Sequence, residues 1–412
     1  MLNTTEDSML LEEIRNIHIE RKLCGKTENA LLSVSDDLLL YILSLLRDEA
    51  PVLPDASISE WNEMLSALRA HWIIPLLYWE IGHLPHKLRP PKDITTQMRQ
   101  SFLWSRARCF QMERQLRVII EAFNEDGISV LVLKGLALAR AVYPDPATRP
   151  SSDIDLLVLP EHVIKARNIL ETLSYKCLER RFETFRNFHR DEEFIHKEDS
   201  KNNLSVEIHW ALSMFSGSKW KVDINEIFSR SVKIETPGLS FNMLHPVDNL
   251  IHASLHMLIG HSQDLRLIWI YDCALLAHHI TLTNDWEMLI KKSETYETQI
   301  VLKNALKMAQ LWSNLKIPVR FRDLYLKPEP SHIDDVAWSD PIQWRSDQIS
   351  KFTFNLFFSN NLSPFKRALQ LFHVIFPHPD IVRMKYPPSH SWLLPLSYIR
   401  RWWKWIREII LF

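Results

Sequence analysis

The residues that most clearly suggest chemistry are two aspartates one residue apart, Asp153 and Asp155. They begin the apolar segment DIDLLVL, which we expect to be a strand. Because side chains alternate along a strand, both carboxylates point to one face, with backbones roughly 6.5 to 7 Å apart. Such carboxylates repel each other unless a cation lies between them, and Mg²⁺ prefers oxygen ligands. An exposed edge strand with two solvated acids is the alternative, but residues 156–159 are too apolar for one, so we favour a metal site.

A later segment, VEIHW at residues 206–210, repeats this alternation. In a strand, Glu207 and His209 would share one face and the apolar side chains the other. A third carboxylate on a neighbouring strand would complete a two-metal site, in which ions about 3.5 to 4 Å apart activate the attacking oxygen and stabilise the leaving one. Any amphipathic strand alternates in this way, so the pattern gains its meaning from Asp153 and Asp155.

Upstream of the aspartates, Lys134 and Gly135 end an apolar, β-branched segment, residues 128–135, which we expect to be a buried strand. A helix follows directly, and the free backbone N–H groups and the dipole at a helix start favour an anion. Glycine would let a phosphate approach the backbone closely, and Lys134 with Arg149 would neutralise a triphosphate. A Lys-Gly pair after a strand is common and indicates little by itself. Here it supports a phosphate site because the two aspartates follow it in the chain.

Apolar and amphipathic segments surround these residues. Strands are expected at 128–135, 153–159, 193–196 and 204–210, and helices at 137–142 and 161–175. Residues from about 6 to 124 carry apolar side chains at helical spacing, and prolines divide them into separate helices. Helical spacing returns at 248–280 and 285–312, and the chain after Pro318 is irregular and rich in proline.

These elements predict an α+β fold, a small mixed-sheet core flanked by N-terminal and C-terminal helical regions. A chain of 412 residues is long enough for two or three domains. The boundaries we expect are 1–124 for the N-terminal helical region, 125–244 for the core, 245–317 for a helical domain, and 318–412 for an irregular and helical C-terminal region.

The composition excludes several classes of protein. Only seven glycines are present, about a quarter of the usual ~7%, and no two are close enough for a phosphate loop of the Rossmann, Walker or kinase type. A net charge of -1 argues against a broadly basic nucleic-acid binder. Four cysteines without a CxxC pair offer neither a zinc knuckle nor a disulfide framework. Together with a polar N-terminus and no apolar run of about 20 residues, they indicate a cytoplasmic protein.

The stretch VLKGLALARAVYPDPATRPSSDIDLLVL, followed by VEIHW, resembles the polymerase β-type nucleotidyltransferase superfamily. Within it, the chain is similar to a family of bacterial nucleotidyltransferase-like proteins, and the helical segment IHASLHMLIGHSQDLRLIWIYDCALL extends the similarity. The resemblance is strongest over residues 128–312. It implies an enzyme that uses Mg²⁺ or Mn²⁺ to transfer a nucleoside monophosphate from an NTP to a hydroxyl of a saccharide, small molecule, peptide or protein, releasing pyrophosphate.

The resemblance also implies roles for individual residues. It assigns catalysis and metal binding to Asp153, Asp155 and Glu207. It assigns nucleotide binding to Lys134, Gly135, Arg149, His209, His256 and Arg266. Leu136 stands where the superfamily usually has a second small residue, which favours the alternative of a degenerate nucleotide-binding or scaffold protein that retains the fold. A transferase acting on RNA is a further alternative, with nucleic acid the less favoured partner.

Two histidines, His252 and His256, are one helical turn apart, and His261 follows closely. This spacing can bind zinc, but no glutamate of the HExxH kind lies between them. We favour the lining of a nucleotide or acceptor cleft, or structural hydrogen bonding, over zinc. Arg266 and Asp272 either pair with each other or reach into the same cleft.

Two further segments have open interpretations. Residues 179–190 interleave basic side chains with phenylalanines, as surfaces for single-stranded nucleic acid do, but a phenylalanine every three residues more simply makes a buried helical stripe. The C-terminal tail LLPLSYIRRWWKWIREIILF mixes tryptophans with basic residues, as interfacial amphipathic helices do. We favour a terminal helix docked on the protein's own core over peripheral membrane contact.

Overall fold

The computed structural model of the chain describes residues 7–12, 14, 34–178, 190–196, 204–212, 222–260, 265–325, 376 and 393–410. The described residues up to 325 belong to one compact unit, and Phe376 and the C-terminal helix belong to a second. The basic and aromatic segment at 179–189 and His261 lie outside the described residues.

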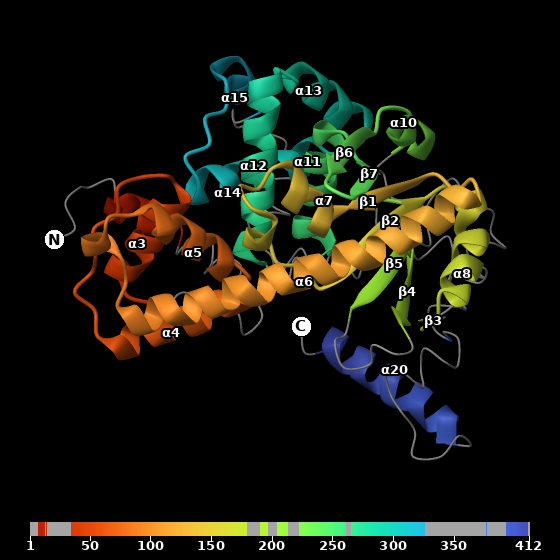
Figure 1. The fold of residues 1–412 in the computed structure, drawn as a ribbon, viewed down its shortest axis with the longest axis horizontal. Helices are drawn as coiled ribbons and strands as arrows, with labels where there is room; N and C mark the ends of the chain where they lie inside the picture. Colours follow the sequence, from red (N-terminus) through yellow and green to blue (C-terminus); the bar gives the residue numbers. More distant parts are fainter. Residues whose placement is uncertain are drawn as a thin grey trace. The chain divides into compact units, whose positions relative to one another are not determined.

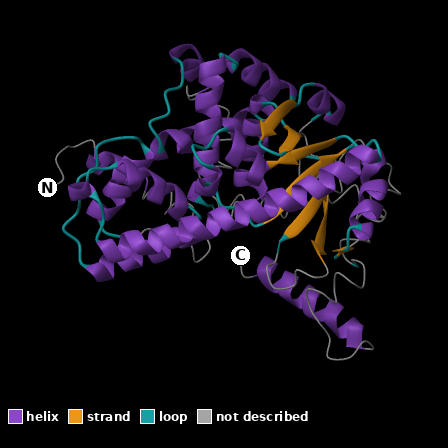
Figure 2. Ribbon diagram, viewed as in Figure 1, coloured by secondary structure: helices purple, strands orange, loops and turns teal. Residues whose placement is uncertain are grey.

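Seven strands of the described residues form a mixed sheet in the first unit, in the order β3-β4-β5-β2-β1-β7-β6 (Figures 1 and 2). They are β1 (Val130–Leu133), β2 (Asp153–Val158), β3 (Tyr175–Cys177), β4 (Asp191–His196), β5 (Ser205–His209), β6 (Val232–Thr236) and β7 (Leu239–Met243). At its centre β2 runs parallel to β5 and antiparallel to β1, and β1 runs parallel to β7. The predicted α+β fold with a mixed sheet is confirmed.

Four strands lie where the sequence predicts them, with ends that differ by a few residues. The prediction omits the three-residue strand β3 and the hairpin formed by β6 and β7. The hairpin sequence VKIETPGLSFNM does alternate, and Gly238 at its turn has a φ of +77°, which glycine adopts without strain. Alternation together with a Pro-Gly turn was therefore the available signal for these two strands.

Helices surround the sheet. In chain order they are α3 (Asp36–Leu46), α4 (Ile58–Ala70), α5 (Ile74–His83), α6 (Lys92–Glu125), α7 (Lys134–Ala141), α8 (Val163–Thr172), α10 (Ile224–Ser229), α11 (Pro246–Leu255), α12 (Leu267–Thr283), α13 (Trp286–Thr295), α14 (Gln299–Trp312) and α15 (Val319–Tyr325). Short 3₁₀ turns at His86–Leu88, Pro146–Thr148 and Pro160–His162 connect them, and a π-helical turn, His256–Gly260, follows α11. The second unit contributes α20 (Leu394–Ile410).

The predicted division of the N-terminal region into separate helices is confirmed, whereas the later helices are more broken than their spacing predicts. The expected helix over 248–280 divides into α11, the π-helical turn and α12, and the turn ends at Gly260, a residue that destabilises helices. The expected helix over 285–312 divides at Glu297, whose φ of +56° lies outside the helical region. Directly after Pro318, α15 forms where irregular chain is predicted, since proline fits the start of a helix.

The sheet separates two hydrophobic clusters. On one face, β2 and β5 pack with α6 and α8 in a cluster that includes Ile154, Leu156, Val206 and Ile208. On the other face, a smaller cluster includes Leu157 and side chains of α10. Because residues alternate along a strand, the polar residues of β2 and β5 share this second face and gather beside the smaller cluster.

The helix α6 joins the N-terminal helices to the sheet. Its 34 residues span roughly 51 Å at 1.5 Å per residue. In Figure 1 it runs from beside α4 and α5, past the strands, to the neighbourhood of α8. Buried side chains line it at both ends, with Met98 and Phe102 near its start and Leu116 and Phe123 near its end. Its interior contains neither proline nor glycine, so nothing in its sequence interrupts the helix.

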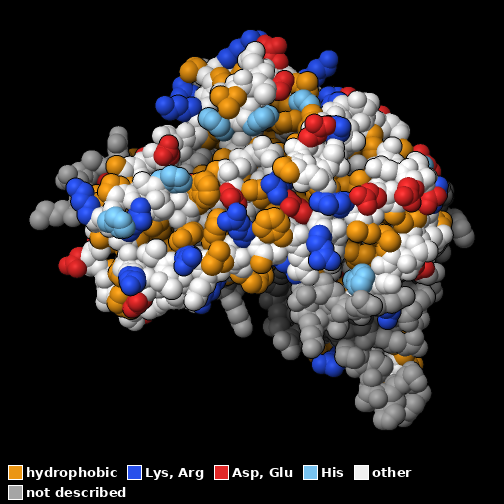
Figure 3. Space-filling view, viewed as in Figure 1, with side chains coloured by type: hydrophobic (Ala, Val, Ile, Leu, Met, Phe, Trp, Pro, Cys, Tyr) orange, Lys and Arg blue, Asp and Glu red, His pale blue; other side chains and the backbone are white. Residues whose placement is uncertain are grey.

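The surface of the described residues carries both signs of charge. On the face in Figure 3, basic and acidic side chains are interspersed, which agrees with the net charge of -1. A search of the described helices for one with both the length and the apolar character needed to cross a bilayer finds none.

Candidate active site

The register of three neighbouring strands brings the predicted acids together. In the parallel pair of β2 and β5, Asp155 lies directly opposite Glu207, and Leu157 lies opposite His209. In the antiparallel pair of β1 and β2, Leu133 lies opposite Asp155. The residue after Leu133 is Lys134, so the chain delivers an ammonium group to the carboxylate at the same edge of the sheet.

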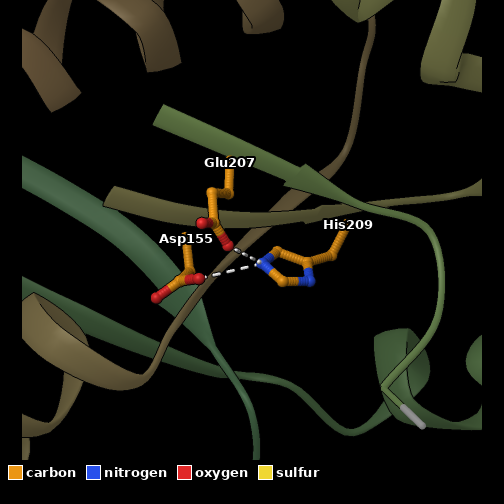
Figure 4. Close-up of side chains that lie close together, drawn as sticks. All are labelled: Asp155, Glu207 and His209. Carbon is orange, nitrogen blue, oxygen red and sulfur yellow. Dashed lines mark hydrogen bonds and ion pairs between the residues drawn. The ribbon is translucent and has the colours of Figure 1, made fainter. Parts of the chain in front are cut away.

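Asp155 is the centre of the cluster. His209 lies with Nε2 2.8 Å from Asp155 Oδ1 and 3.3 Å from Glu207 Oε2, so its imidazole bridges the two carboxylates (Figure 4). The Lys134 ammonium lies 2.8 Å from the same Asp155 oxygen. The side chains of Asp155 and His209 are only 2% and 1% exposed, whereas Glu207 is 26% exposed. Glu207 is therefore the member of the cluster that solvent and a substrate reach most easily.

Charge pairing dominates the ionisation of this cluster. Burial alone would raise the pKa of Asp155, but the Lys134 ammonium and the His209 imidazole hold it well below its usual value. Burial opposes protonation of His209, yet its hydrogen bonds to Asp155 and Glu207 raise its pKa. Asp155 is thus an anion, and its carboxylate interacts with the Lys134 ammonium and the His209 imidazole.

Asp153 has a different environment from Asp155. Burial and the nearby charge of Asp155 raise the pKa of Asp153 to about 6, and the more distant cations Lys134 and Arg149 offset this only in part. Its carboxyl group approaches the Ser151 hydroxyl at 3.5 Å. Asp153 therefore bears a repulsion that a divalent cation between the two aspartates would relieve.

The donor set fits a metal ion. Asp155, Glu207 and His209 each offer one ligand atom, and these atoms lie within 4.8 Å of one another. Asp153 stands two residues before Asp155 on the same face of β2 and lies outside this tightest group. The carboxylates suit Mg²⁺ or Mn²⁺, and the imidazole is either a ligand or an outer partner that orients the carboxylates.

Replacing Asp153 by asparagine is expected to stabilise the metal-free protein. The folded-state pKa of about 6 exceeds the ordinary value of 3.8, so ionisation of Asp153 destabilises the fold as the pH rises through this range. At pH 7, Asp153→Asn should raise the free energy of unfolding in EDTA by about 3 kcal/mol, and the gain should shrink toward zero near pH 4. Urea unfolding at both pH values measures this. A gain that does not depend on pH would contradict the explanation.

Gly135 forms the turn between β1 and α7. Lys134 has a φ of +42°, an unusual value for a residue with a side chain, and Gly135 has non-helical angles of φ 3° and ψ -102°. A Cβ atom at Gly135 would lie 2.4 Å from the Ser151 hydroxyl and 3.7 Å from an Arg149 nitrogen. The backbone here is thus packed closely against Ser151 and Arg149, at a helix start where an anion is favoured.

Arg149 is held by a partner that the sequence does not reveal. Its Nε and Nη2 donate to the two carboxylate oxygens of Asp272, at 3.2 and 2.8 Å. Tyr143 donates to the same carboxylate at 2.7 Å, and Arg149 Nη1 donates to the Pro150 carbonyl. All of these groups are buried. Asp272 therefore pairs with Arg149 rather than with Arg266, and it joins α12 to the segment before the aspartates.

Asp272→Asn is expected to destabilise the fold strongly. It leaves the buried Arg149 guanidinium without its counter-charge, and removing one partner of a buried pair costs about 3 to 5 kcal/mol. Glu235→Gln is the matched control, because the Lys233–Glu235 pair is exposed on both sides and exposed ion pairs contribute little to stability. Urea unfolding compares the two variants, and equal losses would show that burial of the pair is not decisive.

Arg266 and His256, the residue that directly follows the helix α11, lie beside an aromatic group made of Trp72 and Trp269. The Arg266 guanidinium lies 4.9 Å from the Trp72 ring centre and 5.0 Å from that of Trp269, and His256 meets Trp269 edge-on at 5.0 Å. Burial, with help from Lys134, lowers the pKa of His252 well below its usual value, so His252 is neutral. Among the described residues, the group able to hold a metal does not include the histidines of this helix, so zinc binding there gains no support.

Sequence reasoning missed several residues that surround the carboxylates. Asp191 on β4 lies opposite His209, with an oxygen 4.0 Å from His209 Nδ1. Ser151 packs against Gly135, and Tyr143 shares the carboxylate that holds Arg149. For Asp191 the sequence offers no clear signal, because DEEFIH begins with three consecutive acids, and the structure alone shows that Glu192 is the buried one of the three.

Comparison with known proteins identifies a family for this chain. The sequence model of a protein family described as "Uncharacterised nucleotidyltransferase" matches residues 57–314. This range covers more than half of the 412 residues and extends from the start of α4 to the end of α14. It includes the sheet, the carboxylates and the helices that carry Arg266 and Asp272. No curated protein matches the chain.

Proposed function

The chain belongs to this family of uncharacterised nucleotidyltransferases, and on that premise we propose that it transfers a nucleoside monophosphate from an NTP to a hydroxyl acceptor, releasing pyrophosphate. The observation that carries the proposal is the pairing of Asp155 with Glu207 on adjacent parallel strands, beside the turn formed by Lys134 and Gly135. Membership of the family supports nucleotidyl transfer in general. The choice of an NTP as donor, of a divalent metal and of a hydroxyl acceptor is our proposal.

We assign metal binding to Asp153, Asp155 and Glu207, with Mg²⁺ or Mn²⁺ as the ion. The raised pKa of Asp153 supports this assignment, because burial and the neighbouring carboxylate of Asp155 disfavour its negative charge, and the surrounding cations do not fully compensate for this. Bound divalent ions would stabilise the attacking and leaving oxygens of the transfer. His209 contacts Asp155 and Glu207 from a buried position, so we assign it to orienting these carboxylates rather than to contact with the nucleotide.

The same geometry suggests where the nucleotide would bind. Lys134 and the backbone at Gly135 would hold the phosphates, since an ammonium group and a close backbone approach meet there. The guanidinium of Arg149, which Asp272 holds in place, adds a positive charge beside the turn at Gly135. The aromatic group around Arg266 offers flat rings on which a base can stack, and His256 borders it.

Glu207 is our candidate for the group that takes the proton of the acceptor hydroxyl. It is more exposed than Asp155 and lies on the strand beside the aspartates, within the same cluster. A saccharide, a small molecule, a peptide or protein, or an RNA end could supply the hydroxyl, because the fold does not select among them. We place the reaction in the cytoplasm on the cysteine spacing of the sequence.

The alternative function, a degenerate scaffold protein, rests on Leu136. The surroundings of Leu136 in the structure give this alternative little support. Leu136 is 3% exposed and belongs to the large hydrophobic cluster on the face opposite the carboxylates. Its side chain therefore packs in the core, where it does not obstruct the approach of a phosphate to Gly135. Retention of three clustered acids, with the repulsion seen at Asp153, argues for a working site.

Labelled nucleotides test the proposal. The full chain is incubated with each α-³²P-labelled NTP, Mg²⁺ or Mn²⁺, and a fractionated cell extract, and the label in each fraction is followed together with pyrophosphate release. We expect transfer from at least one NTP, dependent on the metal and absent from Asp155→Asn. Glu235→Gln, a substitution on the exposed strand β6, is the control and should retain full transfer. Absence of both NTP binding and transfer with every nucleotide and metal would overturn the proposal.

A further inference from the structure

The C-terminal helix α20 has two unlike sides. On one side Tyr398 and Trp402 pack with Phe376, with ring centres 6.4 and 5.2 Å from the Phe376 ring. On the other side Leu396, Ile399 and Trp403 are 57%, 47% and 67% exposed. The helix thus has an internal partner for one part of its apolar surface and leaves a second part in contact with water.

The exposed side chains form one continuous stripe. Positions 396, 399 and 403 are separated by three and four residues, the spacing that places side chains on one face of a helix. Arg400 is exposed beside them. In the sequence, the same spacing continues with Ile406 and Ile410.

The charge of α20 is strongly one-sided. The helix contains Arg400, Arg401, Lys404 and Arg407 against a single acid, Glu408, although the whole chain has a net charge of -1. The helix that carries the exposed apolar stripe is therefore basic in its sequence, with Arg400 exposed beside the stripe. A partner complementary to this helix presents an apolar layer beneath a negatively charged surface.

We propose that α20 binds the surface of an anionic lipid bilayer, with Leu396, Ile399 and Trp403 inserted at the level of the headgroups. Interfacial helices share this combination of a basic polar face, a tryptophan and exposed aliphatic side chains. Tryptophan favours the membrane interface, and basic side chains are attracted by the negative potential of anionic lipids. The helix lies along the surface, and the proposal does not depend on the reaction assigned to the carboxylate site.

Two other partners fit the helix less well. A nucleic acid would use the basic residues and stack on Trp403, but it would leave the aliphatic side chains Leu396 and Ile399 exposed. A second copy of the chain would bring one basic helix against an identical one, and like charges repel at short distance. An anionic bilayer accommodates both the charge and the aliphatic stripe.

Vesicle flotation with the full chain tests the proposal. Phosphatidylcholine vesicles with and without phosphatidylglycerol are used at low and high salt. We expect binding only where phosphatidylglycerol is present, weakening with salt. The double variant Leu396→Ser/Trp403→Ser should bind at least about tenfold more weakly. Trp104→Ser is the matched control, because Trp104 is a tryptophan of the first unit that is 59% exposed, and it should bind like the unchanged protein.

The other partners give distinguishable results. Lack of binding to phosphatidylglycerol vesicles, or equal binding by the double variant, would overturn the proposal. Salt-sensitive binding of single-stranded RNA that Arg400→Glu removes, without vesicle binding, would replace it with a nucleic-acid surface. Concentration-dependent self-association that Trp403→Ser removes, without vesicle binding, would replace it with a dimer contact. Thermal unfolding of each variant checks that the fold is retained, as expected for exposed positions.

Discussion

Asp155→Asn is expected to lower nucleotidyl transfer by more than about 100-fold, since even the outer partners of metal ligands are worth about 10- to 100-fold. The substitution removes the carboxylate that Lys134 and His209 share and that faces Glu207 across the strand pair. We also expect added Mg²⁺ or Mn²⁺ to raise the melting temperature of the unchanged protein but not that of Asp155→Asn, because a ligand stabilises only the state that binds it. Label transfer and thermal unfolding with and without metal measure the two effects.

Comparison with Asp153→Asn separates loss of chemistry from loss of fold. Asp155→Asn should also destabilise the metal-free protein by about 3 kcal/mol, because it leaves the ammonium of Lys134 and the buried imidazole of His209 without their shared anion. Asp153→Asn should stabilise the metal-free protein and yet lose activity. If both variants lose transfer while their stabilities move in opposite directions, unfolding cannot be the cause. Full activity in Asp153→Asn would remove that residue from the site.

Gly135→Ala is expected to weaken NTP binding by at least about tenfold. The new Cβ would lie 2.4 Å from the Ser151 hydroxyl, so either the turn or Ser151 must move, and the approach of a phosphate to the backbone is lost. Gly135→Val, with a larger side chain, should abolish binding. Equilibrium binding of a labelled NTP measures the effect, and circular dichroism checks that the fold persists.

A double variant identifies the source of the effect at Gly135. Ser151→Ala removes the hydroxyl and leaves the Ser151 Cβ 3.2 Å from the added atom, so Gly135→Ala/Ser151→Ala should recover much of the lost binding. Gly82→Ala is the matched control, since a Cβ there meets nothing within 4 Å, and it should bind NTP normally. Equal losses from Gly82→Ala and Gly135→Ala would show that the turn has no special role.

The face that carries the acids could be predicted because it depends only on local alternation. Asp153 and Asp155, like Glu207 and His209, lie two residues apart, and both segments are strands. The pairing of Asp155 with Glu207 depends instead on the register of two strands that are distant in sequence. Register is fixed by packing and by the connections between strands, which local patterns do not contain.

The partners of the charged groups could not be predicted, because they come from distant parts of the chain. Arg149 and Asp272 are 123 positions apart, and only the placement of α12 brings them together. The nearer candidate, Arg266, stands six residues before Asp272, but it precedes the first residue of α12 and has an extended backbone. Its guanidinium stacks on Trp72 and Trp269 instead.

Very short strands leave no periodic signal, and weakly apolar strands leave only an alternation of side-chain types. β3 has three residues, fewer than any pattern requires. In the hairpin of β6 and β7, charged and polar side chains occupy alternate positions, and only one face is buried. Pairing with β1 along its edge stabilises β7, and this contact is invisible in the sequence of the hairpin itself.

The length of α6 has a mechanical consequence. One uninterrupted helix of 34 residues contacts both the N-terminal helices and the sheet. It connects them stiffly, because bending it would strain hydrogen bonds along many turns. The N-terminal helices and the carboxylate-bearing strands are therefore elastically coupled and move as one body. Opening and closing over a bound nucleotide is therefore expected to leave α6 and the elements packed on it in place, and the backbone amides of α6 nearest its buried side chains should exchange slowly with solvent.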